Sequence, residues 1–288
     1  MDLGFDYKAA FSRNIGWVTD QEQEILSNKR VAIAGAGGVG GEHLVTLSRL
    51  GVQKFNISDF DDFEIHNFNR QAGAFMSTIG RAKCEVMAEV VKDINPKADV
   101  IRFDDGINAS NVDEFLKDVD IYVDSLDFFA IDARILLFKK CKEKSIPVVT
   151  AAPIGMGCAF LCFMPGQMSF EKYFRFQDCK SDTERYAKFV VGLTPKFLSY
   201  SYLIKGVVDL NAGKGPSTPM GVKMCASIAA TYVLKIILQR GKLLVAPHGM
   251  QFDGYLNKLA KSYVPFGNKN PLQIFKYHFA KREFTKKI

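Results

Sequence analysis

Short apolar runs alternate with helical patterns through the first half of the chain. Five segments have the length and apolar content of buried strands: Val31–Ala34, Lys54–Ser58, Val100–Phe103, Ile121–Asp124 and Pro147–Thr150. Apolar residues recur at helical spacing between them: Val39–Leu50, Gly80–Ile94, Val112–Leu116 and Ala130–Glu143. Strands that alternate with helices predict an α/β fold with a doubly wound, mainly parallel sheet.

The pattern changes after about residue 156. Gly157–Met164 and Gly249–Asp253 are predicted to be antiparallel strands, so the parallel sheet gains an antiparallel C-terminal extension. The remaining segments are predicted to be short helices at 5–27, an aromatic, mostly helical stretch Phe170–Asp209, a linker Asn211–Pro219, a buried helix Met220–Gln239 and a basic helix from Pro271. The basic helix, with Leu272, Phe275 and Phe279 on one face, suits RNA or a membrane surface, although a solvated face is the simpler interpretation.

Composition places few limits beyond solubility. The chain of 288 residues is 48% hydrophobic and 24% charged, values typical of soluble globular proteins. The first twenty residues lack a signal-peptide pattern, and we find no apolar run of about 18 residues, so we expect a cytoplasmic protein without a transmembrane segment. The net charge of +7 suits polyanions such as nucleotides or RNA, although a basic surface of this size more often reflects plain solubility than a nucleic-acid site.

A glycine-rich turn is the strongest local signal. The strand Val31–Ala34 runs into a cluster of five glycines, and the next strand ends at Asp59; the glycines are Gly35, Gly37, Gly38, Gly40 and Gly41. Glycines let a phosphate approach the backbone, and the following helix offers unpaired N–H groups. We interpret the segment as a mononucleotide-binding βαβ unit rather than an empty tight turn. No Lys-Ser/Thr pair follows the glycines, which excludes a Walker-type loop.

The segment after Asp59 helps to distinguish an enzyme that binds a dinucleotide from one that binds a nucleoside triphosphate. It reads DFDDFEIHNFNRQ, and Lys83 follows Arg70 at a distance of thirteen residues. Dinucleotide sites mostly neutralise phosphate with backbone N–H groups, whereas a triphosphate attacked at its α-phosphorus needs cations for the leaving pyrophosphate. Arg70 and Lys83 therefore favour a triphosphate, unless both are merely solvated surface side chains.

Six motifs in order resemble the ThiF/MoeB/HesA superfamily of adenylyltransferases, which includes ubiquitin-activating enzymes. They are Arg13-Asn14-Ile15, Gly35-Ala36-Gly37-Gly38-Val39-Gly40, Asp59-Phe60-Asp61, Asn67-Phe68-Asn69-Arg70-Gln71, Lys83 and Asp127. The resemblance covers residues 10–165 well and implies one ThiF-type domain over 1–288. Its parts would be N-terminal helices (1–29), a nucleotide-binding core (30–155) and a C-terminal region (156–288) with the antiparallel strands, the substrate crossover and a helix.

The resemblance also implies roles for these residues. Asp59, with Asp61, would bind the ATP ribose side; the Gly35–Gly41 loop would cradle the phosphates; Asn67, Arg70 and Lys83 would bind the triphosphate. Asp127 would hold Mg²⁺, and its alternative role is a helix N-cap for Ala130–Glu143. Arg13 would reach a phosphate of the neighbouring subunit, which requires a homodimer; a solvated surface role is its alternative.

The chain departs from the family around Asp127 and in its cysteines. Phe128-Phe129 follows Asp127 where many members have Asn, Arg134 comes two residues late, and Asp124 and Asp132 are competing carboxylates. The six cysteines form no Cys-x-x-Cys pair, so we expect no zinc site and reduced thiols. Cys179, beside Lys180, is the best candidate for a thioester, although we favour an inert thiol. The linker Gly213–Pro219 would be the family's mobile loop over the substrate tail.

We therefore expect an ATP-dependent adenylyltransferase that converts a carboxylate to an acyl-adenylate. The favoured acceptor is the C-terminal glycine of a ubiquitin-like or sulfur-carrier protein, and a carboxylate on modified tRNA or on a peptide is the alternative. An NAD(P)-dependent oxidoreductase shares the glycine fingerprint and Asp59 but leaves Arg70, Lys83 and Asp127 unexplained. A non-catalytic nucleotide-binding scaffold is the third hypothesis, because the segment after Asp127 is altered.

Overall fold

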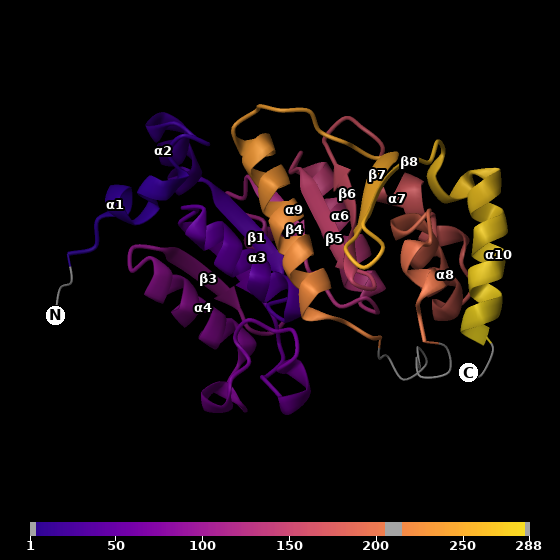
Figure 1. The fold of residues 1–288 in the computed structure, drawn as a ribbon, viewed down its shortest axis with the longest axis horizontal. Coiled ribbons are helices and arrows are strands. Elements are labelled where there is room, and N and C mark those ends of the chain that lie inside the picture. The colour runs from indigo at the N-terminus through magenta and orange to yellow at the C-terminus, as the bar shows by residue number, and fades with distance from the viewer. Residues whose placement is uncertain (1–3, 205–214, 286–288) are drawn as a thin grey trace. The chain divides into compact units, whose positions relative to one another are not determined.

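A computed structural model describes residues 4–204 and 215–285, which form two compact units (Figure 1). The first unit comprises Met1–Ser125 and Ala226–Leu243, and the second comprises Leu126–Cys225 and Leu244–Ile288. The end of the predicted aromatic stretch and the first part of the predicted linker, residues 205–214, lie outside the described residues.

The first unit is built on parallel strands. These are β1 (Arg30–Ala34), β2 (Lys54–Ser58), β3 (Asp99–Phe103) and β4 (Ile121–Asp124), in the order β3-β2-β1-β4. All three neighbouring pairs are parallel, as predicted. The strand order reverses between β1 and β4, and ligands of such sheets bind beyond the carboxyl ends of the strands at this reversal.

Most helices of the first unit lie within a few residues of the predicted bounds. The helices of this unit are α1 (Tyr7–Phe11), η1 (Ser12–Asn14), α2 (Asp20–Asn28), α3 (Gly38–Arg49), η2 (Ile65–Asn67), η3 (Met76–Thr78), α4 (Lys83–Ile94) and α5 (Val112–Phe115). Of these, η2 and η3 fall in the segment after Asp59, for which no helix was predicted. Thr19 and Glu22 form a capping box that starts α2. Helices α3 and α4 lie side by side, with Leu44 and Met87 among the residues that they bury in the core (Figure 1).

The second unit carries the antiparallel strands. These are β5 (Val148–Pro153), β6 (Gly157–Phe163), β7 (His248–Asp253) and β8 (Lys258–Tyr263), which pair in sequence order. Every residue of β6 is buried, which explains its continuous apolar run. Strand β8 was not predicted, because Lys258 and Lys261 interrupt the apolar pattern of this mostly exposed strand. The two groups of strands confirm the predicted fold class.

Short helices and one long helix complete the second unit. They are α6 (Ile131–Glu143), α7 (Phe170–Phe174), η4 (Phe176–Asp178), α8 (Asp182–Leu193), η5 (Leu198–Ser201), η6 (Gly267–Lys269) and α10 (Pro271–Thr285). Helix α10 packs along α8, where Ala280 meets Ala187 and Val191 (Figure 1). Its predicted apolar face points outward, since Leu272 and Phe275 are 70% and 75% exposed.

The predicted apolar helix is α9 (Pro219–Ile237), which contributes residues to both units. Among the described residues it is the helix long and apolar enough to cross a membrane, and half of its most apolar window is buried inside the fold. Val222, Cys225 and Val233 are nearly inaccessible to solvent. This burial agrees with the predicted core helix.

Candidate functional site

The glycine turn between β1 and α3 is packed too closely at Gly40 to accept a side chain. Gly35 has φ +92° and donates its N–H to the carbonyl of Ser58 at 2.7 Å. A Cβ added at Gly40 would lie 1.6 Å from the carbonyl oxygen of Gly35, so only glycine fits there. The N-cap of α3 is Gly37, and no side chain caps the helix. The first N–H groups of α3 therefore suit an anionic ligand.

Asp59 is held against this turn. Its Oδ2 accepts the Ala36 N–H at 2.7 Å, and its Oδ1 accepts the Asp61 N–H at 2.9 Å. Burial raises the pKa of Asp59, and the neighbouring Lys83 charge opposes that rise. The acid that the sequence places at the end of β2 thus lies beside the glycine backbone, as a contact to a ribose would require.

Lys83 brings a buried cation to the same place. Its Nζ lies 2.7 Å from Oδ2 of Asp61 and 4.0 Å from Oδ1 of Asp59, and its side chain is 7% exposed. The Lys83 N–H donates to the Asp61 carbonyl at 3.0 Å, and a bridge pairs Asp62 with Ala82. The start of α4 is therefore tied to the segment after β2, which fixes the ammonium group near the glycine turn.

Asn67 and Arg70 lie on the following turn. Asn67 is buried, and its Oδ1 accepts the Glu64 N–H at 2.9 Å. Arg70 is half-buried and donates from Nη1 to the His66 carbonyl at 3.0 Å and to Oδ1 of Asn69 at 2.9 Å. In the described part of the chain, no hydrogen bond or ion pair joins Arg70 to Asp59, Asp61 or Lys83. Its predicted phosphate contact stays a prediction.

Gln71 is a further candidate, which belongs to the Asn67–Gln71 motif but had no predicted role. Its side chain is 9% exposed, and a Cβ on Gly37 would lie 3.4 Å from its Nε2. Within residues 4–204 and 215–285, the Gln71 Oε1 has no hydrogen-bond partner. A buried, unsatisfied carbonyl oxygen beside the glycine turn favours a contact with a ligand donor. Its place next to Arg70 in the motif was the only signal in the sequence.

Asp127 lies near the start of the second unit, in the short segment that precedes α6. Its Oδ1 accepts the Phe129 N–H at 2.9 Å, and the residue is exposed. The helix starts at Ile131 after Ala130, which is its N-cap, so Asp127 does not serve as the N-cap. A single exposed carboxylate fits Mg²⁺, which commonly takes one or two carboxylates together with phosphate oxygens. No group of three or more His, Cys, Asp or Glu side chains surrounds a metal site among the described residues.

The altered residues after Asp127 have a structural role. Phe128 and Phe129 pack at ring-centroid distances of 5.3 Å from Phe189 and 5.0 Å from Tyr186, respectively. Arg134, only 2% exposed, donates from Nη2 to the carbonyls of Leu126 at 2.6 Å and Asp127 at 3.1 Å. The displaced arginine thus holds the backbone that carries Asp127.

Both competing carboxylates are engaged elsewhere. Asp124 is 3% exposed within β4, and its Oδ1 accepts the Tyr122 hydroxyl at 3.3 Å. Asp132 pairs with Nη1 of Arg185 at 2.9 Å. Asp127 therefore remains the best metal candidate of the three.

Arg13 lies on η1 and is exposed. The nearby Trp17 is 87% exposed, while Arg240 donates to the Trp17 carbonyl at 2.6 Å and pairs with Glu22 at 3.1 Å. The N-terminal segment is therefore anchored to the first unit by its backbone and presents side chains to the outside.

Cys179 is half-buried, and burial raises the pKa of its thiol although Lys188 partly opposes that rise. A raised pKa disfavours the thiolate that a thioester requires. The predicted loop Gly213–Pro219 lies partly outside the described residues, so its role is left as a prediction.

Residues 11–273 match the ThiF family. A tRNA threonylcarbamoyladenosine dehydratase of Bacillus subtilis is 34% identical over 142 residues, which are 49% of this chain and 55% of that protein. The SAMP-activating enzyme E1 of Haloferax volcanii is 33% identical over 135 residues, 47% of this chain and 49% of its own length. The chain thus spans about half the length of these relatives.

The fold also agrees with a solved structure. The E. coli tRNA N6-threonylcarbamoyladenosine dehydratase, solved in complex with AMP, superposes with a TM-score of 0.59 and 23% sequence identity. The match covers 81% of this chain and 95% of that one. The predicted superfamily is confirmed by the family match, and the predicted fold by this superposition.

Proposed function

Because the chain belongs to the ThiF family, we propose that it is an ATP-dependent adenylyltransferase that activates a carboxylate as an acyl-adenylate. The observation that carries this proposal is the buried Lys83, held 2.7 Å from Asp61 and 4.0 Å from Asp59 beside the glycine turn. A desolvated cation at this place suits the charge of a triphosphate. We also propose that the two units act as one adenylation domain, in the cytoplasm.

The proposed reaction is a displacement at the α-phosphorus of ATP. An acceptor carboxylate oxygen forms the new P–O bond, and the bond to pyrophosphate breaks. The carboxylate is already ionised, so no general base is needed. The glycine turn and the start of α3 bind phosphate oxygens, and Asp59 accepts from the ribose hydroxyls. Lys83, Arg70 and Asn67 stabilise the charge on the departing pyrophosphate.

Asp127 is proposed to hold a Mg²⁺ ion. When bound, the ion would neutralise phosphate charge, and its hard oxygen ligands would come from Asp127 and the nucleotide. Arg134 would act as a positioning residue, because its guanidinium donates to the carbonyls of Leu126 and Asp127, which lie on either side of the Asp127 Cα.

The acceptor is proposed to be the C-terminal glycine of a ubiquitin-like or sulfur-carrier protein. The likeness to a SAMP-activating enzyme supports this choice. A carboxylate on modified tRNA is the second candidate, supported by the likeness to a tRNA threonylcarbamoyladenosine dehydratase and by the net charge of +7. A peptide carboxylate fits the same chemistry.

Transfer from ATP labelled at the α-phosphate distinguishes these acceptors. The protein is incubated with a carrier ending in Gly-Gly, with tRNA bearing a carboxylate, or with a peptide, and the acid-labile labelled adduct is measured. Label on the carrier supports the first choice, and label on tRNA or peptide replaces it. ATP binding without label on any acceptor would instead support a nucleotide-binding scaffold. Tight NADH binding without ATP binding would support an oxidoreductase.

A homodimer is proposed as the working form. Arg13 would then reach the nucleotide of the partner subunit. Large apolar side chains are exposed along the segment after β2, a feature typical of an interface; they include Phe60, Ile65, Phe75 and Met76.

A further inference from the structure

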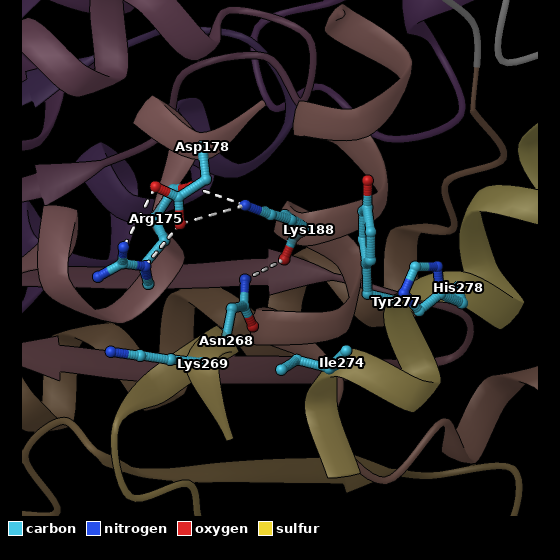
Figure 2. Close-up of a pocket in the computed structure, with 8 residues that line it drawn as sticks. All are labelled: Arg175, Asp178, Lys188, Asn268, Lys269, Ile274, Tyr277 and His278. Atoms are coloured by element: carbon cyan, nitrogen blue, oxygen red, sulfur yellow. Dashed lines mark hydrogen bonds and ion pairs between the residues drawn. The ribbon is translucent and has the colours of Figure 1, made fainter. Parts of the chain in front are cut away.

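A basic pocket in the second unit is lined by none of the residues assigned to adenylation. It occurs where the end of α7, η4, α8, η6 and α10 meet, and its volume is about 250 Å³. Figure 2 shows its lining, which consists of Arg175, Asp178, Lys188, Asn268, Lys269, Ile274, Tyr277 and His278. Three permanent cations and one histidine therefore face a single carboxylate.

That carboxylate is already shared. Asp178 accepts from Nε of Arg175 at 2.6 Å and from its Nη2 at 3.2 Å, and Nζ of Lys188 lies 3.9 Å away. The neighbouring cations lower the pKa of Asp178, with the Arg175 hydrogen bond as the main cause and Lys269 contributing through its charge. The single negative charge of Asp178 is thus shared by three positively charged side chains.

The burial of Lys188 makes the surplus of positive charge in the pocket energetically unfavourable. Its side chain is 12% exposed, and its Nζ donates to the Arg175 carbonyl at 2.9 Å and lies 5.8 Å from the centre of the Tyr277 ring. A partly desolvated ammonium with only a shared counter-charge is unfavourable unless a further anion approaches. Lys269 is exposed on η6, and its ammonium forms no ion pair among the described residues.

We propose that this basic pocket binds the phosphate group of a nucleotide. A dianionic phosphate matches the surplus of two positive charges better than a carboxylate does, and arginine and lysine are the usual phosphate ligands. Ile274 and the rings of Tyr277 and His278, whose centroids are 5.2 Å apart, supply an apolar wall for the organic part of the ligand. The volume lies below that of most drug-sized pockets, so the bound part is small.

The test measures thermal stabilisation by inorganic phosphate, against chloride at equal ionic strength. It uses the full chain and Arg70→Ala, which removes a proposed ATP ligand but leaves this pocket intact. Both proteins are expected to gain stability with phosphate. Lys269→Ala, which changes an exposed side chain, should weaken the apparent phosphate affinity roughly ten- to hundredfold. Lys258→Ala, an equal loss of charge on β8, should leave the affinity unchanged.

Asp178→Asn should bind phosphate more tightly, because the substitution removes the negative charge that the cations share. Misfolding would not produce such an increase in affinity. The proposal is overturned if Lys269→Ala keeps the wild-type phosphate affinity, if Lys258→Ala weakens it equally, or if only Arg70→Ala abolishes the stabilisation. Competition by 5′-CMP and by a short single-stranded RNA that carries a 5′-terminal phosphate then identifies the source. The more effective competitor shows whether the dianionic phosphate belongs to a free nucleotide or to the end of a polynucleotide.

Discussion

The Lys83 ammonium lies 2.7 Å from the Asp61 carboxylate and 4.0 Å from that of Asp59, in a side chain only 7% exposed. Asp59 in turn accepts the N–H of Ala36 within the glycine turn. The cation is therefore positioned through two acids at the carboxyl end of β2. The Asp61 side chain is 52% exposed, and we propose that a phosphate oxygen replaces it as the partner of Lys83 when ATP binds.

Replacing Lys83 by Met should reduce adenylation far more than stability. The methionine keeps most of the buried volume but removes the charge opposite the leaving pyrophosphate, so kcat/KM should fall by about 10²- to 10³-fold. Steady-state release of pyrophosphate measures the loss.

The matched control is Lys92→Met, which changes an exposed lysine on the same helix. Its kcat/KM should equal that of the wild type. Equal losses in the two variants would show that Lys83 acts only through the general charge of α4, and near-normal activity of Lys83→Met would remove it from the site.

The buried His43 should make the protein sensitive to acid. Burial in α3 lowers the pKa of His43 from 6.5 to about 3. Above pH 6.5 the imidazole is neutral in both the folded and the unfolded state. Below pH 6.5 the imidazole of the unfolded chain binds a proton, whereas that of the folded protein stays neutral until about pH 3. The free energy of unfolding should therefore fall between pH 6.5 and pH 3, by about 2 kcal/mol at pH 5.

Urea unfolding at pH 7.5 and pH 5 measures this loss. His43→Leu should lose about 2 kcal/mol less than the wild type over that interval. The exposed His66 provides the control, since His66→Leu should lose as much as the wild type. The same pH dependence in wild type and His43→Leu would contradict the assignment.

How far the sequence predicts this molecule depends on how local each signal is. The glycine turn, β1 and β2 follow from neighbouring residues, because glycine geometry and apolar runs act within a few positions. Strand β8 was missed because it lies at the edge of the sheet, where its lysines face solvent, and the sequence does not show which strand lies at the edge. The orientation of α10 also escaped prediction: Gln273 is buried because its Nε2 donates to the Val191 carbonyl at 2.9 Å, a partner distant in sequence.

The candidate site shows the same division. The order of motifs predicts Asp59, Asp61 and Lys83, and the fold brings these three together. Arg134 acts on the carbonyls of Leu126 and Asp127 across a turn. Only its displaced position in the sequence pointed to it, because backbone contacts leave no pattern of residue types.

Mixing two inactive variants should test the role of Arg13. If Arg13 serves the partner's nucleotide, Arg13→Ala and Arg70→Ala homodimers both fail, but a mixed dimer contains one intact site. After subunit exchange, an equal mixture should regain about a quarter of wild-type activity. The recovered rate and the dimer fraction are measured together. Mixed dimers without any recovery would place Arg13 outside the partner's site.

Cys179 should be dispensable for the reaction. Because burial raises the pKa of its thiol, alkylation by iodoacetamide should be slow at pH 7 and accelerate above pH 9. Cys179→Ala should form acyl-adenylate at the wild-type rate. A thiol-labile thioester between Cys179 and the acceptor, formed with release of AMP, would show instead that the thiol takes part.

Exchange of labelled pyrophosphate into ATP tests the central claim most directly, since it reports reversible attack on the α-phosphorus. In the presence of a carboxylate acceptor, the wild-type protein should incorporate label, while Arg70→Ala and Asp127→Ala should lose at least about 10²-fold in rate. Omitting the acceptor should abolish exchange. Undiminished exchange in both variants, or none with carrier, tRNA or peptide, would contradict the proposed adenylation.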